Sequence, residues 1–242
     1  MNSILDIACF SNKEPNKENN EDFYLPPTFD NEFNIVLAIA DGVGTASSAK
    51  LASNLAIEAV RECLKESEFS IESAFARAKK EIDKIEINTA TTLTIIHILS
   101  SEVIIGHLGD CRAYFKKGNK LTQITRDQTR YQDLLDSGEH KMKNLRNHKE
   151  RLSSILTSAL SRKTEPQYDK VTLSIDDIVD GEILDLYLMS DGAYKHWHLR
   201  PKFSDKTMNS PAAFASSLKK RIEKNIDDDY TLLALKILKN KN

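Results

Sequence analysis

The segment "TATTLTIIHILS" (residues 89–100), followed at once by "EVIIGHLGD" (102–110), decides the fold class. Both runs are rich in isoleucine, valine and threonine, which favour strands. Only a tight polar turn at Ser100 and Ser101 separates them. A parallel pair would need a crossover of a dozen residues or more, so two strands joined this closely must be antiparallel. The sequence therefore predicts antiparallel sheet and not repeated strand–helix–strand units.

Helical periods lie on both sides of this block. Apolar residues recur at spacings of three and four, which predicts helices at residues 47–64, 70–85 and 210–226. Further strands are expected at residues 34–42, at 112–124 as a hairpin turning at Gly118 and Asn119, at 180–192 and at 231–238. This order of elements predicts an α+β sandwich in which helices cover a double sheet.

Composition restricts the class of protein. The chain has 242 residues, of which 40% are hydrophobic and 29% charged, with a net charge of −2. These values are typical of a globular domain and give no general attraction for nucleic acid or an anionic membrane. No apolar run has the length of a membrane span, and the N-terminus does not resemble a signal peptide. Three widely spaced cysteines fit reduced thiols, so we expect a cytoplasmic protein. We also expect a single domain over residues 1–242.

Acidic residues stand where the predicted strands end. Asp41 ends one strand in "ADGVG", Asp110 another in "GHLGD" and Asp191 a third in "LMSDG", while Asp228 and Asp229 directly precede the last strand. A single Asp-Gly pair is most often only a turn. Several such acids at one rim of a sandwich would repel one another and have raised pKa values. Because they are not flanked by matched basic residues, a divalent metal is the better counter-charge.

The available ligands decide which metal is expected. Carboxylate and carbonyl oxygens suit Mg²⁺, Mn²⁺ or Ca²⁺ and not Zn²⁺ or copper. Two such ions sharing carboxylates are the usual hydrolytic pair for phosphate esters, and they activate a water so that no side-chain nucleophile is needed. The glycines after Asp41 and Asp191 would let the backbone approach an ion closely.

The order of these motifs resembles the metal-dependent Ser/Thr protein phosphatase family of the protein phosphatase 2C type, from about Ile7 to Leu238. The matching segments are "NNED" (19–22), "ADGVG" (40–44), "TATTLTIIHI" (89–98), "GDCRAY" (109–114), "LTQITRDQT" (121–129), "LMSDG" (188–192) and "DDYT" (228–231). The resemblance implies an αββα four-layer sandwich, two antiparallel sheets flanked by helices, with a flap at residues 128–152 beside the active site. From its polar composition we expect this flap to be a helix followed by a mobile loop.

The resemblance also implies roles for individual residues. It implies Mn²⁺ or Mg²⁺ as two ions, with Asp41 bridging both and the Gly42 carbonyl binding one. Asp191 and Asp228 would hold the other ion, Glu21 and Asp22 would act through water, and Asp127 would serve a weaker third ion. Asp110 and Arg112 would be structural. Lys17 stands where the family has an arginine that grips the substrate phosphate.

Some positions depart from the family pattern. Lys17 keeps the charge of the arginine but loses its bidentate fork, so weaker substrate binding with catalysis retained is expected. The other departures are Thr45, Ala90, Cys111, Ser158, Ser161 and Asp229, the last of which stands where asparagine is usual.

The resemblance implies a phosphatase that acts on phosphoserine and phosphothreonine in proteins, with a cognate Ser/Thr kinase and no nucleic-acid or membrane partner, as a monomer. Two alternatives stay open. One is a pseudophosphatase, a weak or inactive fold used as a regulatory binding module, and the other is a phosphatase of small molecules.

Some other residues have their own interpretation. His196 and His198 could share a face of an extended segment and bind metal, although the nearby oxygen site already accounts for that region. His97 and His107 are expected to be hydrogen-bonded interior residues, Cys111 a small buried residue, and "KKR" (219–221) a solvated helix face.

Overall fold

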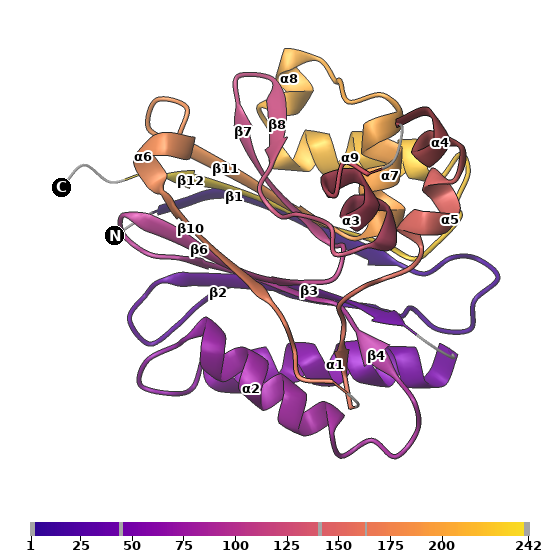
Figure 1. The fold of residues 1–242 in the computed structure, drawn as a ribbon. Helices are drawn as coiled ribbons and strands as arrows, with labels where there is room; N and C mark the ends of the chain where they lie inside the picture. The colour runs from indigo at the N-terminus through magenta and orange to yellow at the C-terminus, as the bar shows by residue number, and fades with distance from the viewer. Residues whose placement is uncertain (1–2, 44–45, 140–141, 163, 240–242) are drawn as a thin grey trace.

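The computed structural model describes residues 3–43, 46–139, 142–162 and 164–239. Two antiparallel sheets face each other, and helices cover the outer face of each (Figure 1). The predicted α+β class and the four-layer αββα arrangement are thereby confirmed. No helix within these ranges is long and apolar enough to cross a membrane.

The first sheet has the strand order β10-β6-β5-β3-β4-β9, and β2 pairs with β3. The predicted turn at Ser100 and Ser101 joins β5 to β6, which pair in antiparallel register. Helices α1 (Ala46–Cys63) and α2 (Ile71–Ile82) cover its outer face. Its strands are β2 (Asp22–Phe29), β3 (Ile35–Val43), β4 (Ala90–Thr91), β5 (Leu93–Ile98), β6 (Glu102–Leu108), β9 (Leu160–Ser161) and β10 (Asp169–Ser174).

The second sheet has the order β1-β12-β11-β7-β8. The predicted hairpin joins β7 to β8, and Gly118 takes the positive φ of 57° that its turn requires. The covering helices are α7 (Asp191–Leu199), α8 (Asp205–Met208) and α9 (Pro211–Ile222), while the short α6 (Ile175–Ile178) precedes β11. The strands are β1 (Ser3–Asn12), β7 (Arg112–Lys117), β8 (Lys120–Gln123), β11 (Ile183–Met189) and β12 (Tyr230–Leu238).

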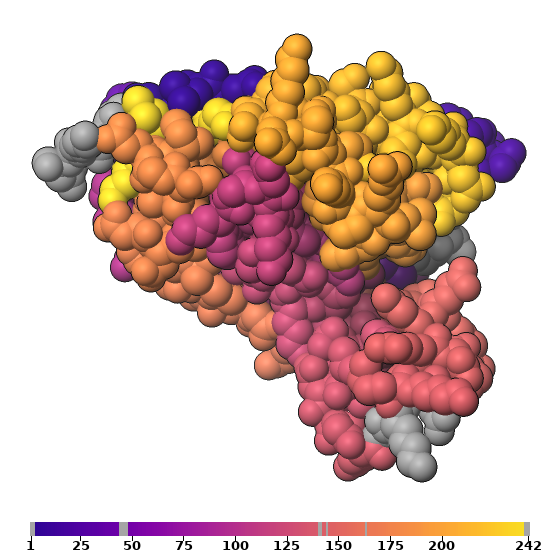
Figure 2. Space-filling view, turned by 90° about the horizontal axis from the view of Figure 1, so that it is seen from above, coloured from indigo at the N-terminus to yellow at the C-terminus, as the bar shows by residue number. Residues whose placement is uncertain are grey.

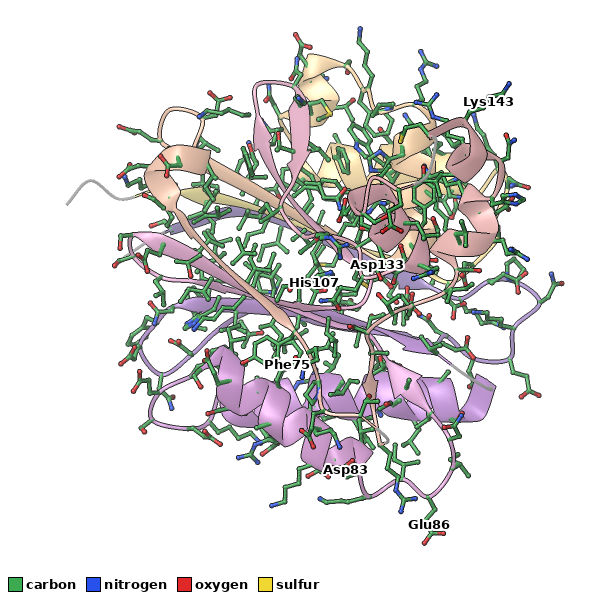
Figure 3. All side chains as sticks on the ribbon, in the orientation of Figure 1. Phe75, Asp83, Glu86, His107, Asp133 and Lys143 are labelled. Carbon is green, nitrogen blue, oxygen red and sulfur yellow. The ribbon has the colours of Figure 1, made fainter. Side chains whose placement is uncertain are left out.

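Apolar packing joins the layers. Leu37, Ile96, Leu186 and Leu235 are fully buried between the two sheets, together with other aliphatic residues of alternate strand positions. On the outer face of the first sheet, Phe75 of α2 points into the core (Figure 3) and stacks on Tyr168 with ring centres 4.1 Å apart. Burial of this apolar surface is the main force that holds the sandwich together.

The flap differs from its prediction. A helix followed by a loop was expected, but the described residues form three short helices, α3 (Arg130–Asp136), α4 (Met142–Asn147) and α5 (Lys149–Ser153). Thr129 caps α3, and Leu145 of α4 is buried, so this polar segment has an apolar anchor of its own. Figure 2 shows the flap as a lobe that projects from the body, and Lys143 on α4 points away from the protein in Figure 3.

A buried charge network supports the second sheet. Asp185 lies in the middle of β11 and is 1% exposed. Lys116 of β7 and Lys236 of β12, on the two neighbouring strands, each approach its carboxylate to 3.0 Å. The Lys116 side chain is itself 3% exposed, so both charges of that pair are out of water.

Asp185→Ala should therefore destabilise the protein strongly, because it leaves two ammonium groups without their counter-charge. A loss of about 3–5 kcal/mol in the free energy of unfolding is expected, measured by urea denaturation. Glu72→Ala removes an exposed pair with Lys170 and serves as control, with an expected change below about 1 kcal/mol. Equal stability of the two variants would contradict this role of Asp185.

Candidate metal centre

The ends of four strands meet at one rim of the sandwich. Asp22 begins β2 and lies directly opposite Asp41 of β3 in the antiparallel register. Asp191 follows β11 and Asp228 precedes β12, which are neighbours in the other sheet. The structure thus places acids from both sheets at the same rim, as the strand-end pattern predicted.

The backbone of Asp41 is fixed by two threonines. The Asp41 N–H donates to Thr92 Oγ1 at 2.9 Å. The Asp41 carbonyl accepts from Thr92 N–H at 2.8 Å and from Thr91 Oγ1 at 2.9 Å. The threonine pair was recognised in the sequence as a motif without a role. Its role in the structure is to set the position of Asp41.

Asp22 is held through one of its two oxygens. Ser190 and Thr231 each donate a hydroxyl hydrogen to Asp22 Oδ2 at 2.7 Å. The other oxygen, Oδ1, is buried and has no hydrogen-bond partner among the described residues. Both hydroxyl residues belong to recognised motifs, but the sequence analysis assigned them no role, because Asp22 lies about 170 and 210 positions away along the chain.

Asp191 does not end a strand. Strand β11 ends at Met189, and Asp191 is the first residue of α7, where a carboxylate is favoured by the helix dipole. Lys195, one turn later, approaches Asp191 Oδ2 to 2.7 Å. Asp191 Oδ1, like Asp22 Oδ1, is buried without a partner in the described part of the chain.

Two glycines permit close backbone contacts at this rim. A Cβ at Gly42 would lie 2.3 Å from the carbonyl oxygen of Ala49 in α1. A Cβ at Gly192 would lie 2.1 Å from the carbonyl oxygen of Asp229. That these glycines let the backbone approach an ion stays a prediction, and the structure shows a further reason for them. They bring α1 against β3, and the start of α7 against the residues before β12.

The acids raise one another's pKa values. Burial raises the pKa of Asp41 well above its ordinary value, and the charges of Asp22 and Asp191 raise it further. Burial also raises the pKa of Asp22 to about 7, although hydrogen bonds from hydroxyl groups lower it. Burial and then the charge of Asp191 raise the pKa of Asp110 to about 8. Charging all of these groups without a cation nearby is therefore unfavourable.

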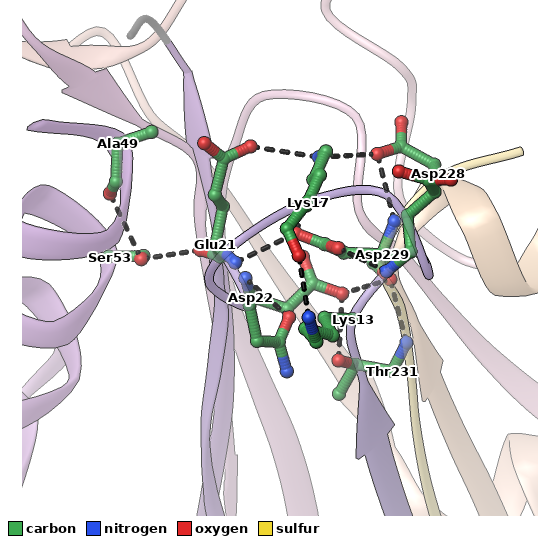
Figure 4. Close-up of polar contacts among 12 residues, drawn as sticks. Lys13, Lys17, Glu21, Asp22, Ala49, Ser53, Asp228, Asp229 and Thr231 are labelled. Atoms are coloured by element: carbon green, nitrogen blue, oxygen red, sulfur yellow. Dashed lines mark hydrogen bonds and ion pairs between the residues drawn. The ribbon is translucent and has the colours of Figure 1, made fainter. Parts of the chain in front are cut away.

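Lys17 is bound by acids of the rim. Its Nζ lies 2.8 Å from Glu21, 2.9 Å from Asp228 and 3.2 Å from Asp229 (Figure 4). Burial lowers the pKa of Lys17, but the hydrogen bonds to Glu21 and Asp228 outweigh this effect and the pKa is raised. Lys17 is thus a fully charged partner of three carboxylates.

Asp229 is the most deeply buried of the three carboxylates that contact Lys17. Its side chain is 3% exposed, and it accepts from the Glu14 and Glu21 N–H groups at 2.7 Å each. Both oxygens are used as acceptors, which an asparagine amide does not allow. Lys17 is a cation that pairs with this buried carboxylate, so the two positions that depart from the family pattern are in direct contact.

Asp110 and Asp127 have different surroundings from those expected. Asp127 accepts a bidentate pair from Arg112, with the Nε contact at 2.8 Å. Asp110 is buried, and repulsion from the charge of Asp191 contributes to its raised pKa. Arg112 thus binds Asp127, whereas Asp110 faces the other acids of the rim.

The four histidines singled out in the sequence have other partners than the carboxylates of this rim. His196 and His198 were considered as a pair on an extended segment, but this is wrong because both lie on helix α7. His196 approaches Asp227 and His198 approaches the hydroxyl of Tyr114. His97 and His107 are buried and hydrogen-bonded, and Cys111 is buried, as predicted. Thr45 lies outside the described residues.

The donor set fits a hard divalent ion. Within the described residues, no three acidic, histidine or cysteine side chains already converge as a finished metal site. Lys17 and Lys195 instead hold oxygens of Glu21, Asp228 and Asp191. Two buried oxygens without partners remain, among carboxylates that repel one another. A cation with oxygen ligands would satisfy both conditions.

The raised pKa values predict the pH dependence of stability in a chelator. For a carboxyl whose folded pKa lies above its unfolded value, stability is highest below the unfolded pKa and is lost as pH rises through the folded one. The melting temperature should therefore fall between about pH 4 and pH 8, as Asp22 and Asp110 are forced to ionise. Thermal melts in EDTA test this. Asp22→Asn should flatten the curve, and an identical curve for that variant would contradict the assignment.

The pairing of Lys17 with Asp229 predicts non-additive stabilities. Lys17→Met leaves the buried Asp229 charge without its cation, so it should destabilise more in the wild type than in an Asp229→Asn background. A coupling free energy of about 1–3 kcal/mol is expected from a double-mutant cycle in urea. Additive effects would mean that the two residues are independent. Lys195→Met combined with Asp229→Asn is the matched control, since Lys195 pairs with Asp191 instead.

Comparison with known proteins places these observations in a family. A family model described as protein phosphatase 2C matches residues 12–231. The serine/threonine protein phosphatase PstP of Mycobacterium tuberculosis is 30% identical over 202 residues, which are 78% of this chain and 36% of that protein. The chain thus spans about a third of the length of this curated relative.

Solved structures share the fold. A crystal structure of the Mycobacterium tuberculosis phosphatase PstP/Ppp superposes with a TM-score of 0.78 at 23% identity, covering 98% of this chain and 100% of the other. The catalytic domain of PstP in complex with two manganese ions has a TM-score of 0.73 at 21% identity, covering 97% and 99%. Because the family model matches nearly the whole length, the chain belongs to the protein phosphatase 2C family.

Proposed function

We propose that this protein is a metal-dependent protein phosphatase that hydrolyses phosphoserine and phosphothreonine esters. The observation that carries the proposal is the acidic rim, in which Asp22 and Asp191 each present a buried oxygen without a partner among the described residues. Family membership supports it. The two manganese ions bound by the catalytic domain of PstP support a pair of ions, Mn²⁺ or Mg²⁺.

The rim residues would divide the work of holding the ions. Asp41, with its backbone fixed by Thr91 and Thr92, would bridge both, and the Gly42 carbonyl would bind one. Asp191 and Asp228 would hold the other. Bound divalent ions supply charge neutralisation and an activated water for in-line attack on phosphorus.

The remaining acids would orient this centre. Glu21 and Asp22 border it, and the hydroxyls of Ser190 and Thr231 fix which oxygen of Asp22 faces inward. For an additional, weaker ion we propose Asp110 with Asp191. Asp127, the residue first considered, is already neutralised by Arg112.

Lys17 would contact the substrate phosphate once metal ions neutralise the carboxylates that it now binds. The ammonium lies on a flexible stem and can turn toward a phosphoryl oxygen, but it lacks the fork of an arginine. We propose a phosphoprotein substrate, a cognate Ser/Thr kinase, a cytoplasmic location and a monomeric state on the same family grounds.

Asp41→Ala and Asp191→Ala should each abolish Mn²⁺-dependent hydrolysis of p-nitrophenyl phosphate, because each removes an oxygen ligand of the centre. A loss of about 10³-fold or more in kcat is expected. Asp83→Ala is the control and should keep full activity. It removes the carboxylate that pairs with Lys79 at the C-terminal end of α2, on the outer helical layer of the first sheet (Figure 3).

In the same assay with a phosphothreonine peptide, Lys17→Ala should raise KM and leave kcat within a few-fold. Full activity of Asp41→Ala would overturn the proposed centre. Calorimetry with Mn²⁺ separates an enzyme from a pseudophosphatase, since an inactive fold would take up no pair of ions.

A further inference from the structure

A basic groove lies on the helical layer of the second sheet, away from the acidic rim. It has a volume of about 480 Å³ and opens beside α9, in the layer coloured gold to yellow in Figure 2. None of its eight lining residues is acidic. Five are cations, gathered around one aromatic ring: Arg200, Lys202, Lys220, Arg221 and Lys224, with Phe203.

The charges of this groove are not balanced by the protein. Within the described part of the chain, none of the five cations forms an ion pair with a carboxylate. In contrast, Lys17, Lys195 and Arg112 at the acidic rim all have acidic partners. An uncompensated concave cluster on a chain of net charge −2 is a local positive field that attracts anions.

Arg221 makes the groove a built feature and not a set of free side chains. Its guanidinium donates to the carbonyls of Arg200 at 2.6 Å, His196 at 3.2 Å and Lys202 at 3.3 Å. It also packs 4.2 Å from the ring centre of Phe203. All three hydrogen-bond partners are neutral, so the charge remains. "KKR" (219–221) was predicted to be a solvated helix face, but Arg221 is half-buried.

Helix α7 connects this groove to the acidic rim. It begins at Asp191 and ends at Leu199, directly before Arg200. Its nine residues span about 12 Å. Lys195 and Leu199 are one turn apart and both exposed, and Leu199 is 79% exposed, the highest value among the large hydrophobic residues described as exposed. An exposed helix face therefore leads from one site to the other.

We propose that the groove docks a second phosphate group of a multiply phosphorylated protein substrate while the first occupies the metal centre. This rests on the proposed function. An extended peptide covers about 3.3 Å per residue, so spanning the roughly 12 Å of α7 requires the two phosphorylated residues to be separated by at least about four positions. The chain between them would follow α7 and contact Leu199.

The shape of the groove favours a peptide over other anions. A lipid surface is flat, so it would contact the outer edge of the groove and would not reach the half-buried Arg221 and Phe203. A duplex nucleic acid is too wide to enter a hollow with a volume of about 480 Å³. A phosphorylated side chain with its neighbours fits such a hollow and receives charge-assisted hydrogen bonds there.

The test compares peptides with one phosphothreonine and with two placed five residues apart. Wild-type protein should hydrolyse the doubly phosphorylated peptide with about a ten-fold lower KM, a ratio that corresponds to one good charge-assisted contact. Arg200→Glu combined with Lys220→Glu should abolish this preference and leave kcat/KM for the single phosphopeptide unchanged. Lys65→Glu combined with Lys80→Glu, on the opposite helical layer, should behave as wild type.

Direct binding separates the failure of this proposal from failure of the proposed function. Fluorescence anisotropy with a doubly phosphonate-substituted peptide, which is not hydrolysed, should show tighter binding to wild type than to the groove variant. If hydrolysis is absent but this difference persists, the groove stands and the phosphatase assignment fails.

If hydrolysis occurs but the groove variant keeps the preference and the affinity, the groove proposal is overturned. Vesicles containing about one third phosphatidylserine form the last arm. Vesicle binding that needs Arg200 and Lys220, without any effect on peptides, would overturn the proposal in favour of a membrane contact.

Discussion

Repulsion among buried carboxylates is the constraint on which the rim of this protein depends. Asp22 and Asp41 face each other in register, and Asp191 joins them from the second sheet. The rest of the fold prevents them from separating. Gly42 and Gly192 hold backbone segments in contact, and hydroxyls fix Asp22 from across the sandwich. Packing and hydrogen bonding thus hold carboxylates together despite their mutual repulsion. Such a site is preorganised for a cation, because each carboxylate attracts a cation that binds between them.

Two unusual residues of the sequence have one electrostatic explanation. An aspartate in place of asparagine adds a buried charge at Asp229, and its oxygens accept two backbone amides from the segment before β2. Lys17, on that same segment, neutralises the charge. Each departure alone suggests a damaged phosphate grip or a damaged acid site. Together they form one ion pair in an ordered network, in which Lys17 and two backbone amides hold the added carboxylate of Asp229, although the pair is one charge more negative than arginine with asparagine.

Local patterns predicted what depends on local physics. Strand-forming residues and helical spacing located β5, β6, α1 and α9, and the strand-end acids marked the rim. What they missed depends on side-chain contacts across long separations. The family resemblance implies a structural role for Asp110 and a third ion at Asp127, and only the side chain of Arg112 in the structure shows that Asp127 is already paired. The charge network of Asp185 could not be predicted from its own apolar strand, because its two lysine partners come from neighbouring strands. The flap helices are short and polar, so they give no clear period.

Helix α7 joins the acidic rim to the basic groove. Its first residue, Asp191, belongs to the acidic rim, and the residue after its end, Arg200, belongs to the basic groove. A metal centre that neutralises one phosphate has no means of choosing among many phosphorylated residues, since all present the same group. A second cationic site at a fixed distance measures the spacing of phosphates along a chain. Because α7 is a regular helix buried on its inner face, that spacing would be set by the helix length and not by a loop.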